Sequence, residues 1–414
     1  MKIYLDNCAS TRVLPEAAKA AWLAMTETYA NPSALHEAGQ SAERLVKQAR
    51  HQIAFSLGTK PGNIVFTGSG TEADNLALFS AFHSGPGSSG NKKGRLLVSS
   101  IEHRAIYAAA EVLAADGVEV VRIPVFGADT DFPGMVDTAA FRSLLTDDTA
   151  LVSVLHVSNE IGTIQPIEEM SRIITLYNTE HGTQIKFHVD AVQSYGKLAI
   201  DVENGDFRRV DLVSMSAHKL HGPKGVGALY ALAPGKLHPM IFGGGQEGGV
   251  RSGTENVPGI VGFGVSARVA SSDVIGHGKQ ANNYRRRLLE GIGAEIPDVF
   301  INSPADASVT GKAGNSSPYV LSMGFPGTRG EVLVHELEKS GIYLSTGAAC
   351  SSLVKDKDNK KDREALMAIG TPDEIREGTL RFGISWMNEA DEISYVVDKL
   401  KKAVERFRQV GVRR

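Results

Sequence analysis

Up to about Gly259 this chain alternates short β-branched runs with longer amphipathic stretches, and this order limits its possible folds more than any other feature. The runs with strand character are Leu96–Ser99, Val118–Ile123, Leu151–Val157, Ile185–Val189, Val210–Ser214 and Val226–Tyr230. The amphipathic stretches between them are Thr71–His83, Arg104–Ala115 and Ile167–Glu180. Strands that alternate with helices pair in parallel, so the order predicts an α/β fold with a mostly parallel sheet and helices on both faces.

Beyond Gly259 the pattern changes. Long helical stretches now bracket fewer strands, and they are Gly259–Ala270, Gln280–Ile292 and Asp391–Arg408. The first fifteen residues look too short and irregular to join the main sheet. Because a chain of 414 residues commonly divides into two domains, we place a second, smaller domain after Gly259.

Composition excludes several classes of protein. The formal net charge of -3 gives no electrostatic reason to bind nucleic acid or an anionic membrane. No apolar stretch reaches the roughly 18 residues of a membrane span, and Met1–Asp6 is not a signal peptide. Two cysteines, Cys8 and Cys350, argue against a disulfide scaffold and favour a reducing cytoplasm.

The segment Ser216–Gly225 places Lys219 after the apolar run Val210–Met215, among hydroxyl and imidazole groups and before glycines. A lysine at a strand end is usually a solvated surface residue. Burial beside other groups, however, lets a lysine lose its proton and act as an amine nucleophile. Such lysines bind carbonyl cofactors covalently, pyridoxal phosphate above all, which also needs an acid for its pyridinium nitrogen. Asp190, after the run Ile185–Val189, is the candidate acid.

The segment Ile64–Asp74 reads as a strand, a turn of glycines and hydroxyl residues, and a helix start. The free N–H groups and the dipole of such a helix N-terminus bind phosphate well. An ordinary helix capped by Ser69 or Thr71 explains the segment equally well. Both interpretations stay open at this point.

Other motifs carry less weight. Gly243–Gly248 matches G-x-G-x-x-G, but we expect no dinucleotide site because Pro258 interrupts the following helix and no clean βαβ unit surrounds the glycines. His218 and His221 lack a nearby Cys or acidic pair, so we expect no metal. His103 follows a strand at the edge where α/β sites form, where a lone histidine is more often structural.

The two cysteines differ in their surroundings. Cys350 lies among small and polar residues in Ser345–Ser352, between an apolar stretch and a highly charged one, which suits a reactive thiolate. Cys8 has no such setting, and we interpret it as structural. The charged stretch that follows Cys350 contains no apolar residue over residues 355–364, so we predict a mobile loop between Ser351 and Glu364.

Taken in order, these motifs resemble the cysteine desulfurases of the NifS/IscS-like family, pyridoxal-phosphate enzymes that take sulfur from L-cysteine for iron–sulfur cluster and thio-cofactor synthesis. The segments that carry the likeness are Tyr4–Asn7, Asn31–Ser33, Thr71–Asn75, Ser158–Gly162, His188–Ser194, Ser216–Gly225, Gly243–Thr254 and Arg381–Gly383. The 31 positions from Cys350 to Arg381 match the form with a long loop. Two features depart from it: a cysteine at position 8, and the high charge after Cys350.

The resemblance implies a role for each site residue. Lys219 holds the cofactor covalently and shuttles the Cα proton, Asp190 keeps the pyridine nitrogen protonated, and Cys350 attacks the substrate sulfur to form a persulfide. Gln193 bonds the phenolic oxygen, and His103 stacks on the ring and exchanges protons. The implied phosphate ligands are Gly70, Thr71, Ser216, His218 and the partner subunit's Thr254. Asn159, beside the cofactor, and Arg381 bind the substrate carboxylate.

The implied fold is the aminotransferase-like fold type I of pyridoxal-phosphate enzymes. Its large cofactor domain spans residues 16–259, and its small α+β domain joins residues 1–15 to residues 260–414. A homodimer with shared sites, L-cysteine as substrate and a sulfur-acceptor protein are implied as partners. A selenocysteine lyase would use the same lysine and cysteine, an aminotransferase would not need Cys350, and a non-catalytic protein of this fold would not keep both.

Overall fold

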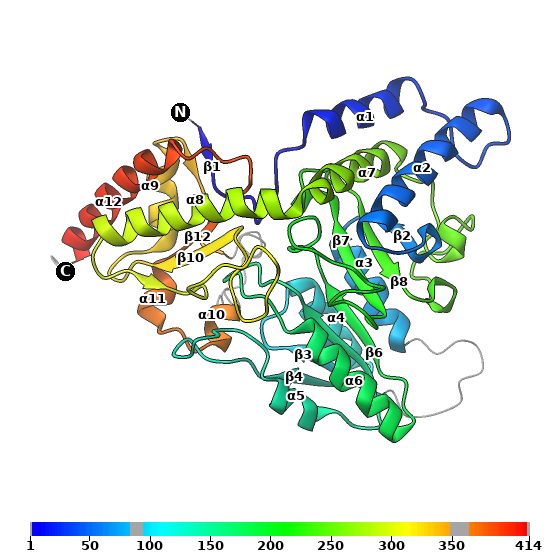
Figure 1. Cartoon of the computed structure of the whole chain (residues 1–414), viewed down its shortest axis with the longest axis horizontal. Coiled ribbons are helices and arrows are strands. Elements are labelled where there is room, and N and C mark those ends of the chain that lie inside the picture. Colours follow the sequence, from blue (N-terminus) through cyan, green and yellow to red (C-terminus); the bar gives the residue numbers. More distant parts are fainter. Residues whose placement is uncertain (1, 83–93, 348–363, 412–414) are drawn as a thin grey trace.

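The computed structural model describes residues 2–82, 94–347 and 364–411 (Figure 1). Its central sheet has seven strands in the order β2-β8-β7-β6-β5-β3-β4. They are β2 (Ile64–Thr67), β3 (Arg95–Ser99), β4 (Glu119–Ile123), β5 (Thr149–Leu155), β6 (Lys186–Asp190), β7 (Leu212–Ser216) and β8 (Gly227–Ala231). Only β8 runs antiparallel to its neighbours. The predicted α/β fold with a mostly parallel sheet is confirmed, and each predicted strand lies within two residues of an observed one.

Helices cover both faces of this sheet because successive strand residues point to opposite sides. On β2, Ile64 and Phe66 join the larger apolar cluster, whereas Val65 joins a separate one on the other face. The helices with residues in the larger cluster are α1 (Pro15–Thr26), α2 (Glu37–Ser56), α5 (Thr138–Leu144), α6 (Ile167–His181) and α7 (Val257–Ser272), and α1 also packs on α7. The opposite face carries α3 (Gly70–Phe82) and α4 (Arg104–Ala115).

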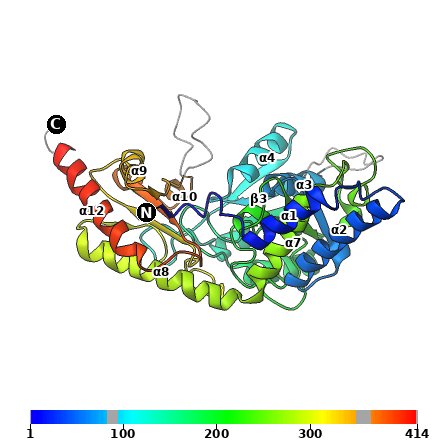
Figure 2. The ribbon, with the colours of Figure 1, turned by 90° about the horizontal axis from the view of Figure 1, so that it is seen from above.

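The elements at the other end of the molecule (Figures 1 and 2) have a third apolar cluster of their own. Its sheet has the order β12-β10-β9, with β9 (Phe300–Ile301), β10 (Val320–Gly324) and β12 (Thr379–Gly383) antiparallel. A short parallel pair joins β1 (Ile3–Tyr4) to β11 (Ile342–Tyr343). The helices here are α8 (Val274–Glu295), α9 (Gly330–Glu338), α11 (Asp373–Glu377) and α12 (Glu392–Gly411), whereas α10 (Glu364–Ala368) packs against Ile101, Leu155 and Ile161 beside the large sheet. Both chain ends therefore build this part.

Helix α7 corrects one expectation. Pro258 does not interrupt a helix but lies in its first turn, where a missing N–H breaks no intrahelical bond. The buried residues of α7, from Val257 to Ala270, belong to the larger cluster. We therefore propose a domain limit near Asp273, between α7 and α8, rather than at Gly259. Within the described residues, none of the helices has the length and apolar character needed to cross a membrane.

Candidate active site

The site forms at the carboxyl ends of neighbouring strands, where open α/β sheets bind ligands. Asp190 ends β6 and Ser216 ends β7, while Gly70 begins α3 shortly after β2. The N-terminal segment crosses this edge, since the backbone N–H of Thr11 donates to the carbonyl of His218 at 2.9 Å. Residues far apart in sequence are thus brought together in one place.

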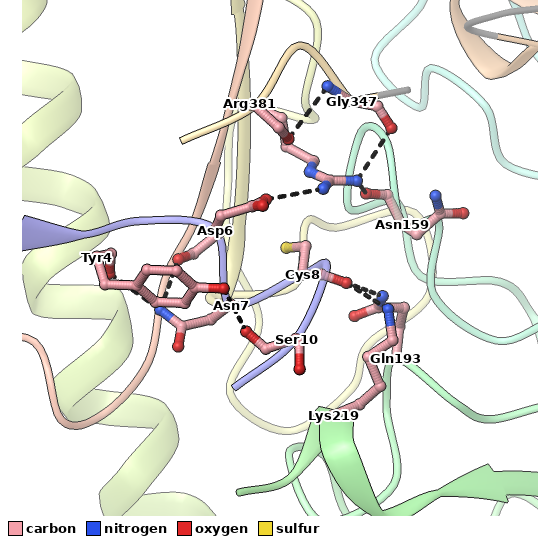
Figure 3. Close-up of polar contacts among 12 residues, drawn as sticks. Tyr4, Asp6, Asn7, Cys8, Ser10, Asn159, Gln193, Lys219, Gly347 and Arg381 are labelled. Atoms are coloured by element: carbon pink, nitrogen blue, oxygen red, sulfur yellow. Dashed lines mark hydrogen bonds and ion pairs between the residues drawn. The ribbon is translucent and has the colours of Figure 1, made fainter. Parts of the chain in front are cut away.

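Lys219 ends a short 3₁₀ turn, Ala217–Lys219, and lies half-buried. Its Nζ donates to the backbone carbonyl of Cys8 at 2.5 Å, and Gln193 Nε2 donates to the same oxygen at 2.8 Å (Figure 3). His103 caps α4, its Nδ1 accepting from the N–H of Ala105 at 3.1 Å. Burial, and then the Lys219 ammonium, lower the pKa of His103 to about 4, so its ring is neutral near pH 7.

Asp190 accepts a hydrogen bond from the N–H of Val192 at 2.8 Å. Burial raises the pKa of Asp190 to about 6, so the carboxyl is largely ionised at neutral pH. Two further acids are buried around it. Burial and the Asp190 charge raise the pKa of Asp74 well above its usual value, and burial raises the pKa of Glu102 to about 8. The site therefore favours one ionised carboxylate, Asp190, which can pair with a cationic ring nitrogen.

A phosphate group fits beside the start of α3. A side-chain carbon added to Gly70 would lie 2.7 Å from Val192 Cγ2, so only glycine fits there. Ser216 Oγ is buried and has no hydrogen-bond partner within the described residues. Ser69 Oγ accepts from the N–H of Glu72 at 3.1 Å and so caps the helix, which agrees with one of the two interpretations of this turn. The start of the capped helix lies beside Ser216, since a carbon added to Gly70 would be 3.3 Å from Ser216 Cβ.

Arg381, on β12, forms hydrogen bonds at this edge both to the part with the large sheet and to the part with the small sheet. Its Nη1 donates to the carbonyls of Asn159 (2.9 Å) and Gly347 (3.1 Å), and its Nη2 donates to Asp6 Oδ1 at 3.1 Å (Figure 3). The side-chain amide of Asn159 points away from the guanidinium. Arg381 is only 2% exposed, and its Nε has no partner within the described residues. This guanidinium therefore keeps a donor for one more anionic oxygen.

The structure does not bring every predicted site residue together at this sheet edge. Cys350 and most of the expected mobile loop lie outside the described residues. Thr254 is exposed in the loop before α7, and Thr71 is exposed on α3. His218 is half-buried with Nδ1 at 3.3 Å from Ser10 Oγ, and burial lowers the pKa of its ring to about 4.

Three residues at the site were missed by sequence reasoning. Cys8 contributes its backbone carbonyl, Asp6 pairs with Arg381, and Lys197 donates to Gln193 Oε1 at 3.4 Å. The thiol of Cys8 is buried and donates to the carbonyl of Tyr319 at 3.6 Å. The motif Tyr4–Asn7 could have indicated Asp6. The role of Cys8 could not be recognised, because a backbone carbonyl is common to all residues and has no sequence signal.

We predict that Glu102→Gln changes how stability depends on pH. The folded protein keeps a proton on Glu102 up to about pH 8, whereas the unfolded chain releases it near 4.5. The wild type therefore loses stability from this group as the pH rises through that interval, by up to about 1.4 kcal/mol per pH unit. In the wild type the N–H of Leu155 donates to Glu102 Oε1 at 2.9 Å. The neutral amide of glutamine keeps an acceptor for this N–H but does not titrate, so the variant lacks the pH-dependent loss of stability. Denaturation at pH 5 and pH 8 measures the difference.

Glu27→Gln, which changes an exposed carboxyl at the end of α1, is the matched control and should follow the wild type. Parallel stability curves for Glu102→Gln and the wild type would contradict a protonated Glu102.

Comparison with protein families gives one match that spans the site. The family described as Aminotransferase class-V matches residues 3–396. The cysteine desulfurase IscS of Clostridium botulinum (strain Hall) is 37% identical over 411 residues, which cover 99% of this chain and 96% of that protein. The cysteine desulfurase NifS of Azotobacter vinelandii is 36% identical over 410 residues, covering 99% and 94%.

Solved structures agree with these matches. A NifS-like protein superposes with a TM-score of 0.85 at 32% identity, covering 98% of this chain and all of its own. SspA in complex with cysteine superposes with a TM-score of 0.72 at 30% identity, covering 94% of this chain and all of its own. The matched residues include every element that forms the sheet edge described above.

Proposed function

Because this chain belongs to the class V aminotransferase family, and within it to the cysteine desulfurases, we propose which of its residues carry out each step of the pyridoxal-phosphate-dependent removal of sulfur from L-cysteine. One observation carries the proposal. The amine of Lys219, the carboxylate of Asp190 and the unpartnered hydroxyl of Ser216 come from successive elements and meet at one sheet edge. These are the three kinds of group that an aldehyde, a pyridine nitrogen and a phosphate require.

The cofactor, when bound, supplies an electron sink that makes the Cα proton of the substrate acidic. Lys219 would bind its aldehyde and move the Cα proton, and Asp190 would hold the ring nitrogen protonated. Gly70, Thr71, Ser216 and His218 would hold the phosphate, and His103 would face the ring as a neutral group that can accept a proton. The amide of Gln193 would donate to the phenolic oxygen.

Arg381 binds the substrate carboxylate. Its Nη1 is occupied by two backbone carbonyls and its Nη2 by Asp6, while Nε has no partner within the described residues, and a carboxylate that takes the place of Asp6 could accept from Nε and Nη2 together. A carboxylate accepts two parallel hydrogen bonds from such a pair of nitrogens. Asn159 lies next to this position through its contact with Arg381.

Sulfur leaves through Cys350, a role that rests on the sequence around it. Its thiolate attacks the substrate sulfur, an S–S bond forms and the substrate C–S bond breaks. The electron pair of that bond stays with the substrate carbon, which takes up a proton and ends as L-alanine. The substrate carbon is reduced and the Cys350 sulfur is oxidised to a persulfide, so no outside oxidant is needed. A sulfur-acceptor protein then takes the terminal sulfur for iron–sulfur cluster assembly or thiolation.

Product analysis tests this function. Purified protein, loaded with pyridoxal phosphate and given L-cysteine and a thiol reductant, should release alanine and sulfide in equal amounts. An aminotransferase would instead yield the keto acid and leave the amino group on the cofactor. Release of selenide from L-selenocysteine without any release of sulfide from L-cysteine would identify a selenocysteine lyase.

We also propose a cytoplasmic homodimer in which Thr254 reaches the cofactor phosphate of the partner subunit. Thr254 is exposed in this protomer, so its hydroxyl is available to a second copy. Thr254→Ala should weaken pyridoxal phosphate binding about tenfold, because a hydrogen bond to a charged group contributes about 1.5–3 kcal/mol. Loss of the bound absorption band during dialysis measures this.

Thr179→Ala, an exposed threonine of α6, is the control and should retain cofactor as the wild type does. A fully active species of 44.2 kDa in sedimentation would show that the partner subunit is not needed.

A further inference from the structure

A second amine lies beside the site and has no part in the reaction described above. Lys197 follows β6 in a turn, its backbone N–H donating to the carbonyl of Ser194 at 2.9 Å, and it is only 3% exposed. No carboxylate lies within ion-pair distance of its Nζ in the part of the chain that the structure describes. Burial is the main cause that lowers its pKa to about 8, and the Lys219 ammonium adds to it. A buried cation without a partner acid is costly, so its position calls for an explanation.

The contacts of Lys197 lead to the site. Its Nζ donates to Gln193 Oε1 at 3.4 Å and lies 5.7 Å from the ring centre of Tyr319. Gln193 Nε2 then donates to the carbonyl of Cys8, the same oxygen that receives Lys219 Nζ. The two amines thus stand at the ends of one hydrogen-bonded chain.

This chain has a fixed polarity. An ammonium group has three donors and no acceptor, so the amide of Gln193 must turn its oxygen to Lys197. Its NH₂ group is then left for the opposite side, where Cys8 and Lys219 lie (Figure 3). Without Lys197 either end of the amide could face that side, because the two ends have nearly the same shape.

We propose that Lys197 is a positioning residue that locks the amide of Gln193 with its NH₂ group toward the phenolic oxygen of the cofactor. The inference rests on the proposed function. The locked amide donates to a negatively charged oxygen, whereas a turned amide would place its own oxygen against it. Lys197 acts through Gln193 and does not touch the cofactor.

The test follows the visible absorption band of bound pyridoxal phosphate as a function of pH. Lys197→Met keeps an unbranched side chain of nearly the same length but removes the Nζ that donates to Gln193 and lies over Tyr319. Loss of the donor at the phenolic oxygen leaves more negative charge there, which holds the proton on the adjacent Lys219 nitrogen more strongly. We expect the apparent pKa of the band to rise by about one unit, a tenfold change in proton affinity.

Two further variants show whether the shift of the apparent pKa is caused by loss of the hydrogen bond from Lys197 to Gln193. Lys197→Arg also has donors only and should restore the wild-type titration. Lys186→Met removes an exposed lysine of β6 and should leave the titration unchanged. Loss of packing alone would lower the melting temperature without moving the band, and Lys197→Leu repeats the test if the Met variant does not fold.

An unshifted titration in a folded Met or Leu variant would overturn the inference and leave the proposed function intact. A failure of Lys197→Arg to restore the titration would also overturn it. If the wild type itself binds pyridoxal phosphate without any pH-dependent band, the proposed role of Lys219 fails instead.

Discussion

Lys219→Ala is expected to abolish the release of alanine and sulfide from L-cysteine, with a loss of turnover on the order of 10⁴ or more. In the proposed function the amine serves twice, as the group that binds the cofactor aldehyde and as the base that moves the Cα proton. Its removal also frees the carbonyl of Cys8, but Gln193 still donates to that oxygen at 2.8 Å, so the local backbone keeps a bond.

The loss should therefore arise from chemistry rather than from unfolding. Lys219→Ala should still bind pyridoxal phosphate reversibly, since Asp190 and the phosphate contacts remain, but without the absorption of the covalent form. Lys224→Ala, an exposed lysine of the same segment, is the matched control and should keep both colour and activity. Turnover by Lys219→Ala at the wild-type rate would remove the basis of the assignment.

The main sheet could be predicted because its information is local. Runs such as Val210–Ser214 show continuous apolar, β-branched character, which follows from burial on both faces and needs no knowledge of distant residues. The observed β7 is shifted by two residues, since a strand ends where its pairing ends and not where its apolar residues do. The start of α3 was likewise visible from Ser69 and Gly70.

The centre of the site could not be predicted in the same way. Cys8 and Lys219 are 211 positions apart, and Asp6 and Arg381 are 375 positions apart. Such contacts depend on how the N-terminal segment crosses the edge of the large sheet, which no spacing in the sequence records. The part of Cys8 that matters is a backbone carbonyl, so its side chain indicated only a buried thiol. Lys197 resembled an ordinary surface lysine in the sequence.

Because Cys8 lies beside Lys219 and Gln193, either of the two cysteines could in principle accept sulfur from the substrate. Cys350→Ala is expected to keep the colour of the bound cofactor and to bind L-cysteine, but to release no sulfide above background, a loss on the order of 10³ or more. The reason is that the proposed function assigns the cofactor chemistry to Lys219 and Asp190, whereas breaking the C–S bond needs a thiolate that accepts the sulfur. Mass spectrometry of the wild type after L-cysteine should find one added sulfur on the peptide that contains Cys350.

Cys8→Ala is the control that the structure provides. The Cys8 thiol is 1% exposed and donates to Tyr319, while its contribution to the site is a carbonyl that alanine also has. This variant should keep near-full turnover and lose only about 1–2 kcal/mol of stability, as expected for a shortened buried side chain. If Cys8→Ala stops sulfide release and Cys350→Ala does not, sulfur is carried by the buried thiol, and the site works without the charged loop. The two single variants therefore decide between the buried thiol of Cys8 and the thiol of Cys350 as the group that accepts sulfur.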